Sequence, residues 1–239
     1  AERVVIGVEA NKPDAIALLK KQCADTPVEI LPLQVKYPQG AEKQLIAAAT
    51  GQEVPSGGLP MDVGVAVHNV STAAAVADAV MLGRPLIERI CTVTGPAIKE
   101  PKNLRVRIGM PLSHLVEVCG GLVEDPGKII LGGPMMGFTQ VGFDVPVVRG
   151  TSGLLLLRED DVTKAAEGPC IRCARCVQAC PMNLLPTAIA AYARRSLVDE
   201  TEEYCAMDCI ECGSCSYVCP ANIPLVQSIR LGKAAVLAK

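Results

Sequence analysis

The sequence predicts a multidomain α+β protein built from three segments that differ in their patterning. Residues 1–83 alternate apolar runs with helical stretches, which is typical of an α/β layer. Residues 84–158 contain short strand patterns around a single helix, which indicates a small α+β unit. Residues 159–239 contain two cysteine runs separated by a helix-rich insert, which predicts an α-helical cysteine-rich domain.

Apolar runs and turn residues place the elements of the first segment. Strands are expected at residues 3–9, 28–35 and 63–67, and helices at residues 11–23, 41–49 and 71–82. Pro13 is tolerated in the first turn of a helix, and Ser71 or Thr72 can cap the last helix. The stretches 37–40 and 51–60 are rich in Pro and Gly, so they predict a turn and a loop.

The middle segment is expected to hold one helix among strands. The strands are predicted at residues 88–93, 104–108, 128–131 and 154–157, and the helix at residues 112–119. Gly120-Gly121 can close this helix. The glycine-rich string 132–137 could cradle a phosphate, but it does not stand between a strand and a helix as such a loop does. A tight packing turn is therefore expected there.

Composition excludes several classes of function. The 239 residues carry a net charge of −2, and aromatic residues make up only 3% of the chain. Nucleic acid is not an expected partner, because the chain offers neither a basic footprint nor many stacking side chains. The apolar stretch Val63–Leu82 contains Asn69 and Asp78, which are costly to bury in lipid, so no membrane span is expected. No catalytic residue is predicted, because no acid–base pair or nucleophile constellation is evident.

Twelve cysteines are the most informative feature, and eight of them fall in two tight runs. Clustering of this kind is unlike the disulfide framework of a secreted protein, so we infer a reducing compartment. The run at 170–181 is matched by the run at 209–220, and both continue with an Asn and a Pro. This repetition predicts an internal duplication with a helical stretch at 184–198 between the halves.

Each run has the spacing C-x2-C-x2-C-x3-C-P, the signature of proteins with two [4Fe–4S] clusters, in which the fourth cysteine ligates the other cluster. The first cluster is therefore expected on Cys170, Cys173, Cys176 and Cys219, and the second on Cys209, Cys212, Cys215 and Cys180. Shared ligands make the clusters neighbours, which suits electron relay. Structural zinc is the alternative, but zinc commonly uses two well-separated C-x2-C pairs rather than four cysteines in one run.

The remaining cysteines and the two histidines are not expected to bind metal. Cys23, Cys91 and Cys119 lie in apolar periodic segments and are predicted to be buried small hydrophobes. Cys205 has no counterpart in the first run and stays outside the ligand set. His68 and His114 each stand alone, as packed or surface histidines do.

The two runs differ in charge. Arg172 occupies the position of Glu211, and Arg175 occupies the position of Ser214. Local charge tunes cluster potential, so the first cluster is expected to have the higher potential. The alternative is that these charges face solvent and shift the potentials little.

The sequence resembles the C subunit of the Rnf ion-translocating oxidoreductases over essentially its whole length. The resemblance is carried by the two cysteine runs and by Lys36-Tyr37-Pro38-Gln39-Gly40-Ala41-Glu42-Lys43-Gln44-Leu45-Ile46, Leu131-Gly132-Gly133-Pro134-Met135-Met136-Gly137-Phe138 and Asp144-Val145-Pro146-Val147-Val148. It implies a peripheral subunit on the cytoplasmic side of a bacterial inner membrane. The complex would couple electron transfer between ferredoxin and NAD(H) to movement of Na⁺ or H⁺, with other membrane-complex subunits as partners.

The resemblance also implies three domains. They are the C-terminal half of an FMN/NADH-type α/β domain at 1–83, a β-grasp domain of the SLBB type at 84–158, and a ferredoxin-like domain with two [4Fe–4S] clusters at 159–239. The family's glycine-rich flavin loop is expected before Ala1, because the chain opens directly on a strand pattern as a piece of a longer protein would. FMN binding is implied only together with that missing half.

Five residues match the flavin motifs of the related domain. They are Tyr37, Gly40, Glu42, Asn69 and Thr72. Two motif glutamates are replaced, by Ala41 and by Ser71. An ordinary role as loop and cap residues is an equally good interpretation of these positions.

Two other functions stay open. A cobalamin reductase that combines flavin, β-grasp and dicluster parts is the alternative enzyme. A different class of function is a non-enzymatic binding module, in which the segment from Arg84 to Arg158 binds a ligand or docks neighbouring subunits. Docking is the expected role of that segment, because its sequence shows no convergent polar pocket.

Overall fold

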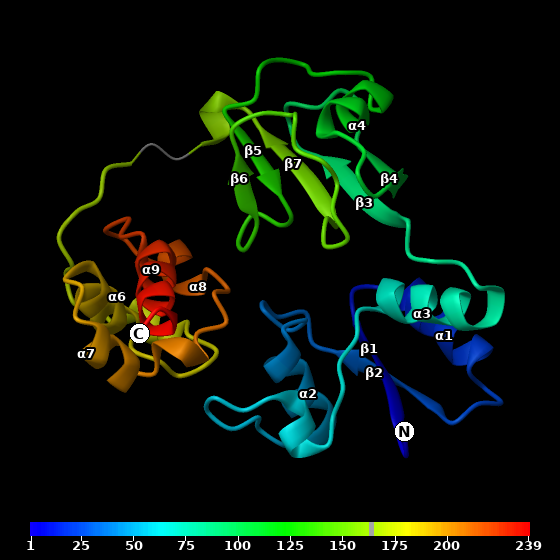
Figure 1. Ribbon diagram of the computed structural model, residues 1–239, viewed down its shortest axis with the longest axis horizontal. Coiled ribbons are helices and arrows are strands. Elements are labelled where there is room, and N and C mark those ends of the chain that lie inside the picture. The colour runs from blue at the N-terminus through cyan, green and yellow to red at the C-terminus, as the bar shows by residue number, and fades with distance from the viewer. Residues whose placement is uncertain (163–164) are drawn as a thin grey trace. The chain divides into compact units, whose positions relative to one another are not determined.

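The computed structural model describes residues 1–162 and 165–239 (Figure 1). Backbone contacts divide the chain into two compact units. The first unit comprises Ala1–Val67, Ala174–Cys212 and Leu225–Lys239, and the second comprises His68–Cys173 and Gly213–Pro224. Each unit therefore combines segments that are far apart in sequence.

The N-terminal part of the first unit is a small parallel α/β layer. Strand β1 (Val4–Glu9) pairs in parallel with β2 (Val28–Leu33), and helix α1 (Pro13–Gln22) connects them. Helix α2 (Glu42–Thr50) follows, and its Ile46 is buried. Helix α2 ends where Gly51 takes the left-handed conformation with φ 74°, which glycine adopts at little cost. The predicted strands and helices of residues 1–50 are thus confirmed.

The strand predicted at residues 63–67 is wrong. A 3-10 turn, η1 (Pro60–Val63), ends at Gly64, whose φ of 68° turns the chain away from an extended course. Residues 65–69 then join no sheet within the described chain.

In the second unit, helix α3 (Val70–Leu82) begins earlier than expected. The cap is Asn69, whose side-chain oxygen accepts a hydrogen bond from the amide of Ser71 (2.9 Å), and the prediction of a Ser71 or Thr72 cap is wrong. Asn69 competes well for this position because its side chain reaches the free amides of the first turn.

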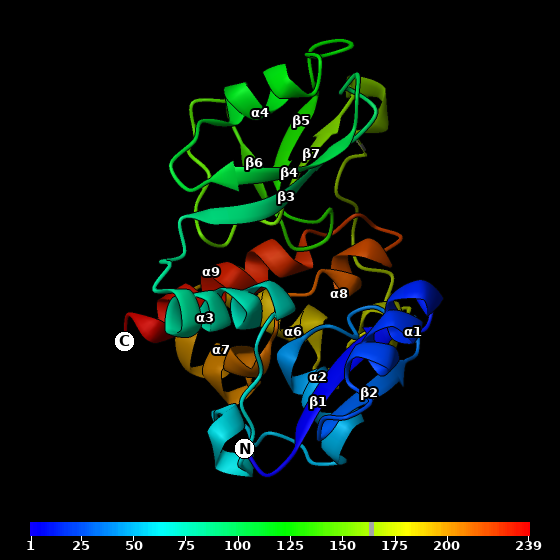
Figure 2. The same ribbon diagram turned by 90° about the vertical axis from the view of Figure 1, so that its right-hand side faces the viewer.

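A five-stranded mixed sheet is the main feature of the second unit (Figure 2). The strands are β3 (Glu88–Thr94), β4 (Lys102–Arg107), β5 (Lys128–Leu131), β6 (Phe138–Gln140) and β7 (Gly153–Leu157). Their order is β4-β3-β7-β5-β6, with β3 and β7 parallel and the other pairs antiparallel. This mixed sheet with a single helix is the β-grasp arrangement expected for the middle segment.

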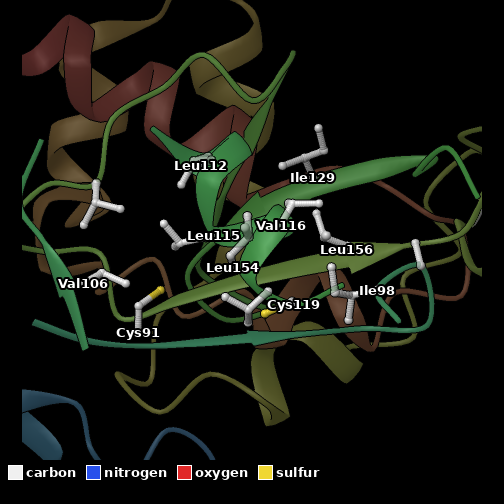
Figure 3. Packing of buried hydrophobic residues seen from close by; sticks show 13 residues of the cluster. Cys91, Ile98, Val106, Leu112, Leu115, Val116, Cys119, Ile129, Leu154 and Leu156 are labelled. Atoms are coloured by element: carbon white, nitrogen blue, oxygen red, sulfur yellow. The ribbon is translucent and has the colours of Figure 1, made fainter. Parts of the chain in front are cut away.

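Helix α4 (Leu112–Val118) packs on the sheet and closes the core (Figure 3). Leu112 and Leu115 of the helix meet Leu154 and Leu156 of β7, and all four are fully buried. Full burial of such side chains stabilises a fold by about 1.5–3 kcal/mol each. Gly120 and Gly121 end the helix with φ of 77° and 85°, as predicted.

The cysteines of this core behave as small hydrophobes. Cys91 and Cys119 are fully buried, as predicted, whereas Cys23 in the first unit is only partly buried. Burial raises the pKa of the Cys91 thiol to about 11, with a smaller contribution from Cys119. Burial likewise raises the pKa of the Cys119 thiol, so both thiols stay neutral at physiological pH.

The glycine-rich string 132–137 forms the connection between β5 and β6. A side chain at Gly137 would lie 2.6 Å from the carbonyl oxygen of Gly133 and 2.7 Å from that of Leu131. Crowding of this kind admits only glycine, which confirms the expected packing turn. Strand β6 was not predicted, because its three residues are too few for an alternating pattern.

The C-terminal part of the first unit is helical (Figure 1). It contains α5 (Arg175–Gln178), α6 (Pro186–Arg194), α7 (Val198–Glu203) and α9 (Leu225–Leu237). Helices α6 and α9 pack against each other, and each contains a fully buried isoleucine, Ile189 in α6 and Ile229 in α9. The helical stretch expected at 184–198 is confirmed as α6, but it ends earlier than predicted, because Ser196 adopts a φ of 57° and separates α6 from α7.

Candidate metal centre in the cysteine runs

The two cysteine runs have the same local backbone structure, which confirms the predicted duplication. Three pairs of corresponding residues have positive φ: Arg172 and Glu211 (55° and 56°), Ala174 and Gly213 (59° and 85°), and Asn183 and Asn222 (55° and 52°). Helix α5 begins after Ala174, and helix α8 (Ser214–Tyr217) begins after Gly213. Five of these six residues are not glycine, so their left-handed conformation is costly and requires support from the surrounding fold.

This backbone conformation suits an anionic iron–sulfur group. Successive amides in mixed right- and left-handed conformations form concavities that bind anions, and many iron–sulfur sites use them. Two cysteine sulfurs already accept amide hydrogen bonds of 3.4 Å, Cys180 Sγ from Leu184 and Cys209 Sγ from Glu211. Hydrogen bonds of this kind tune the reduction potential of a cluster. Eight thiolate donors in two such loops therefore fit two [4Fe–4S] clusters.

Burial differs between the two runs. The third cysteine of each run, Cys176 or Cys215, is buried within the first turn of a short helix. The first two cysteines of the first run, Cys170 and Cys173, are exposed, whereas Cys212 is buried. Solvent exposure is one of the properties that set cluster potential, so the two sites are not equivalent.

Cys180 of the first run interacts electrostatically with Cys209 of the second run. The pKa of the Cys209 thiol is raised mainly by burial, and repulsion from Cys180 and Cys212 raises it further. These residues are three of the four predicted ligands of the second cluster, and all three belong to the first unit.

Among the described residues, the cysteine runs differ from a site for a single metal ion. Within the described ranges, no three His, Cys, Asp or Glu side chains converge closely enough to bind one ion. A cubane cluster separates its thiolate ligands more widely than one ion does. The features that favour a cluster are therefore the number of thiolates, their spacing and the backbone around them.

Two nearby cations compensate the negative charge of Glu211, which distinguishes the second run from the first. Glu211 Oε2 accepts a hydrogen bond from Arg230 Nε (2.8 Å), and Glu211 Oε1 accepts one from Lys233 Nζ (2.7 Å). Burial raises the pKa of Glu211, but hydrogen bonds and attraction from Lys233 and Arg230 outweigh it, so the pKa is lowered overall. Glu211 is therefore not a simple solvent-facing charge, whereas Arg172 and Arg175 are exposed.

The residues matched to flavin motifs have several structural roles. Tyr37 donates its hydroxyl hydrogen to the carbonyl oxygen of Cys212 (2.6 Å), and both residues belong to the first unit. Burial, and to a lesser extent Cys212, raises the pKa of Tyr37. Glu42 begins α2, and Gly40 lies in the preceding turn. Asn69, the cap of α3, and Thr72 belong to the second unit.

Residues that sequence reasoning missed contact the loops beside the cysteines. Asp208, next to Cys209, accepts a hydrogen bond from the hydroxyl of Ser56 and lies 3.8 Å from Lys43 Nζ. Gln44 Nε2 donates to the carbonyl oxygen of Pro181 (3.2 Å). The partners are separated by more than 130 residues, so no local pattern could have revealed them.

Comparison with family models identifies three segments. Residues 1–78 match the Nuo51 FMN-binding domain, residues 90–139 the SLBB domain, and residues 169–223 the 4Fe-4S dicluster domain. Together with the site described above, these matches define a chain of the iron–sulfur dicluster class that also carries part of a flavin-binding domain. The mixed architecture predicted from the sequence is confirmed.

Curated relatives specify the family. The chain is 53% identical, over 98% of its length, to the C subunit of the proton-translocating ferredoxin:NAD(+) oxidoreductase complex of Clostridium ljungdahlii. It is 52% identical over its full length to the Na(+)-translocating counterpart of Acetobacterium woodii, and 45% identical over 97% to the C subunit of the ion-translocating oxidoreductase complex of Rhodobacter capsulatus. Over nearly its whole length, the chain is similar to part of these C subunits.

The match covers only part of each relative. The chain spans 51% of the Clostridium ljungdahlii protein, 54% of the Acetobacterium woodii protein and 45% of the Rhodobacter capsulatus protein. In the part of the chain that the structure describes, no helix is both long and apolar enough to cross a membrane.

Proposed function

We propose that this chain relays electrons through two neighbouring [4Fe–4S] clusters. The observation that carries the proposal is the duplicated C-x2-C-x2-C-x3-C-P run, whose two copies repeat the same left-handed residues and the same short helix. Cysteines at this spacing match the two-cluster signature. The match of residues 169–223 to a dicluster domain supports the same conclusion.

The proposed ligand sets cross between the runs. Cys170, Cys173, Cys176 and Cys219 hold the first cluster, and Cys209, Cys212, Cys215 and Cys180 hold the second. The electrostatic influence of Cys180 on Cys209 supports the crossing. When bound, the clusters supply two adjacent one-electron carriers.

The chain's own groups prepare the second site. The amide of Glu211 donates to the sulfur of Cys209, which stabilises negative charge there. The hydroxyl of Tyr37 fixes the carbonyl group of Cys212, and burial of Cys212 limits access of water. A fixed, partly dry environment reduces reorganisation when charge changes at the site.

The wider role follows from the family. We propose that the chain works as part of the C subunit in a membrane-bound complex that couples ferredoxin and NAD(H) redox chemistry to ion translocation. Its proposed location is peripheral, on the cytoplasmic side of a bacterial cell membrane. The names of the relatives and their 45–53% identity support this role over the cobalamin reductase alternative. The other subunits of the complex are the proposed partners.

FMN is a proposed cofactor of the complete flavin domain. The match of residues 1–78 to an FMN-binding domain supports contacts from Tyr37, Gly40, Glu42, Asn69 and Thr72. The Tyr37 hydroxyl also donates to Cys212, so this residue is a candidate link between the flavin domain and the second run.

The test is iron and acid-labile sulfide analysis, with EPR spectroscopy, on protein purified without oxygen. Two four-iron clusters require about eight iron atoms per chain, together with a coupled pair of S = 1/2 signals after reduction. Zinc without sulfide would mean that the runs are structural, and the electron-relay proposal would then be withdrawn.

A further inference from the structure

We infer that Lys233 is a positioning residue for the second cluster, because its ammonium group fixes the loop Cys209–Cys212 and raises the reduction potential of the cluster held there. The inference rests on the proposed assignment of a [4Fe–4S] cluster to this run. It concerns a residue on the last helix, α9, which lies outside both cysteine runs.

Lys233 connects α9 to the backbone of a cysteine ligand. Its Nζ donates to the carbonyl oxygen of Cys209 (2.9 Å) and to Glu211 Oε1 (2.7 Å). Arg230, one turn earlier on α9, donates from Nε to Glu211 Oε2 (2.8 Å). The three charged groups thus form one network that joins α9 to the loop beginning at Cys209. The Lys233 side chain is 18% exposed, so solvent screens its charge less than it would on the open surface.

The network has a net positive charge. Arg230 and Lys233 each contribute one positive charge, and Glu211 contributes one negative charge. Reduction of a cluster adds a negative charge beside Cys209. A cation that is hydrogen-bonded to a ligand residue favours the reduced form of the cluster, so it raises the reduction potential.

The internal duplication shows that this network is particular to the second run. The positions that correspond to Glu211, Arg230 and Lys233 in the first repeat are occupied by Arg172, Ala191 and Arg194. Arg194 Nε donates to the hydroxyl of Ser228 (2.7 Å). An arginine at position 172 cannot bridge two cations as a carboxylate does, so the second run alone has a carboxylate-bridged arrangement.

This network changes the expectation for the two potentials. From the sequence, Glu211 alone should lower the potential of the second cluster relative to the first. In the structure, its charge is more than balanced by the two cations of α9. The difference between the two potentials should therefore be smaller than the contrast of Arg172 with Glu211 suggests.

The experiment is an EPR-monitored redox titration of the full chain, purified without oxygen, in wild-type and variant forms. Lys233→Met should lower one of the two midpoint potentials. We expect the ratio of reduced to oxidised cluster at a fixed potential to fall about tenfold, which corresponds to about 59 mV for a one-electron couple. Glu211→Gln should move the same midpoint in the opposite direction, because it removes the negative charge.

Two further variants separate charge from structure. Lys233→Arg keeps the cation and should leave the midpoint close to that of the wild type. Lys239→Met is the matched control, because Lys239 is near the end of the same chain segment but pairs with Asp199 and Glu202 instead of the cysteine loop. It should leave both midpoints unchanged.

The outcomes distinguish this inference from the proposed function. Wild-type protein without iron and sulfide would overturn the proposed function itself. Wild-type protein with two clusters, but with midpoints that Lys233→Met and Glu211→Gln leave unmoved or shift in the same direction, would overturn the role of Lys233. If Lys233→Met fails to retain iron, the same titration of Lys233→Gln decides the question, because its side chain removes the cation but can still donate a hydrogen bond to Cys209.

Discussion

Replacement of Gly95 by alanine should destabilise the β-grasp sheet strongly. Gly95 follows β3 with a φ of 121°, a conformation that L-residues with a side chain rarely adopt. A Cβ atom there would collide with the carbonyl oxygen of Leu156 and lie 2.8 Å from both the C and N atoms of that residue. These are backbone atoms of β7, which is paired on both sides in the sheet, so the neighbour cannot move aside.

The magnitude follows from two contributions. The left-handed conformation costs a residue with a side chain about 1–2 kcal/mol. Overpacking against fixed atoms costs about 1–3 kcal/mol more. The free energy of unfolding should therefore fall by about 2–5 kcal/mol.

Gly109→Ala is the matched control for this substitution. Gly109 also has a positive φ, 94°, but no atom would lie within 4 Å of a Cβ atom added there. It should lose only the conformational part, about 1–2 kcal/mol. Urea denaturation of both variants, followed by far-ultraviolet circular dichroism, measures the difference between them. Equal losses in the two variants would show that contact with Leu156 is not the cause.

Three other predictions concern the cluster ligands, the helical core and a buried thiol. Cys180→Ser should disturb the EPR signal of the second cluster, and Cys219→Ser should disturb that of the first. Loss of the first cluster's signal in Cys180→Ser and of the second cluster's signal in Cys219→Ser would refute crossed ligation. Ile189→Ala, at a fully buried position of α6, should lower the free energy of unfolding by about 2–5 kcal/mol in urea titrations, whereas the exposed Leu185→Ala should stay within about 0.5 kcal/mol of the wild type. The folded-state pKa of Cys91 is raised from 9.0 to about 11, so its contribution to stability should be constant below pH 9 and fall as pH rises toward 11; Cys91→Ala should remove this part of the pH dependence in thermal melts.

Local sequence was sufficient wherever a feature depends on neighbouring residues. The spacing of the cysteines and the repetition of the run predicted the duplication, because a ligand loop and its left-handed residues are encoded within about a dozen positions. The same holds for α1, where Pro13 begins the helix, and for the turn at Gly120 and Gly121. Apolar alternation placed the main strands of the sheet for the same reason.

Local sequence failed where a competing interaction decided the structure. The run at 63–67 has the composition of a strand, but a strand needs a partner, and Gly64 turns the chain instead. The stretch at 184–198 has helical composition throughout, yet the left-handed conformation of Ser196 interrupts the helix. The next helix, α7, then packs against α9. In both cases, packing and turn geometry outweighed propensity.

The sequence by itself determined which group the chain is proposed to bind, because thiolate number and spacing are local properties. Only the tertiary structure decided which charges surround the second run. It brings Lys233 and Arg230 from the last helix to Glu211, and it brings Tyr37 from the N-terminal segment to the carbonyl group of Cys212. The physical reason is that electrostatic and hydrogen-bond energies depend on distance in space, and residues 19 to 175 positions apart acquire that proximity only when the chain folds.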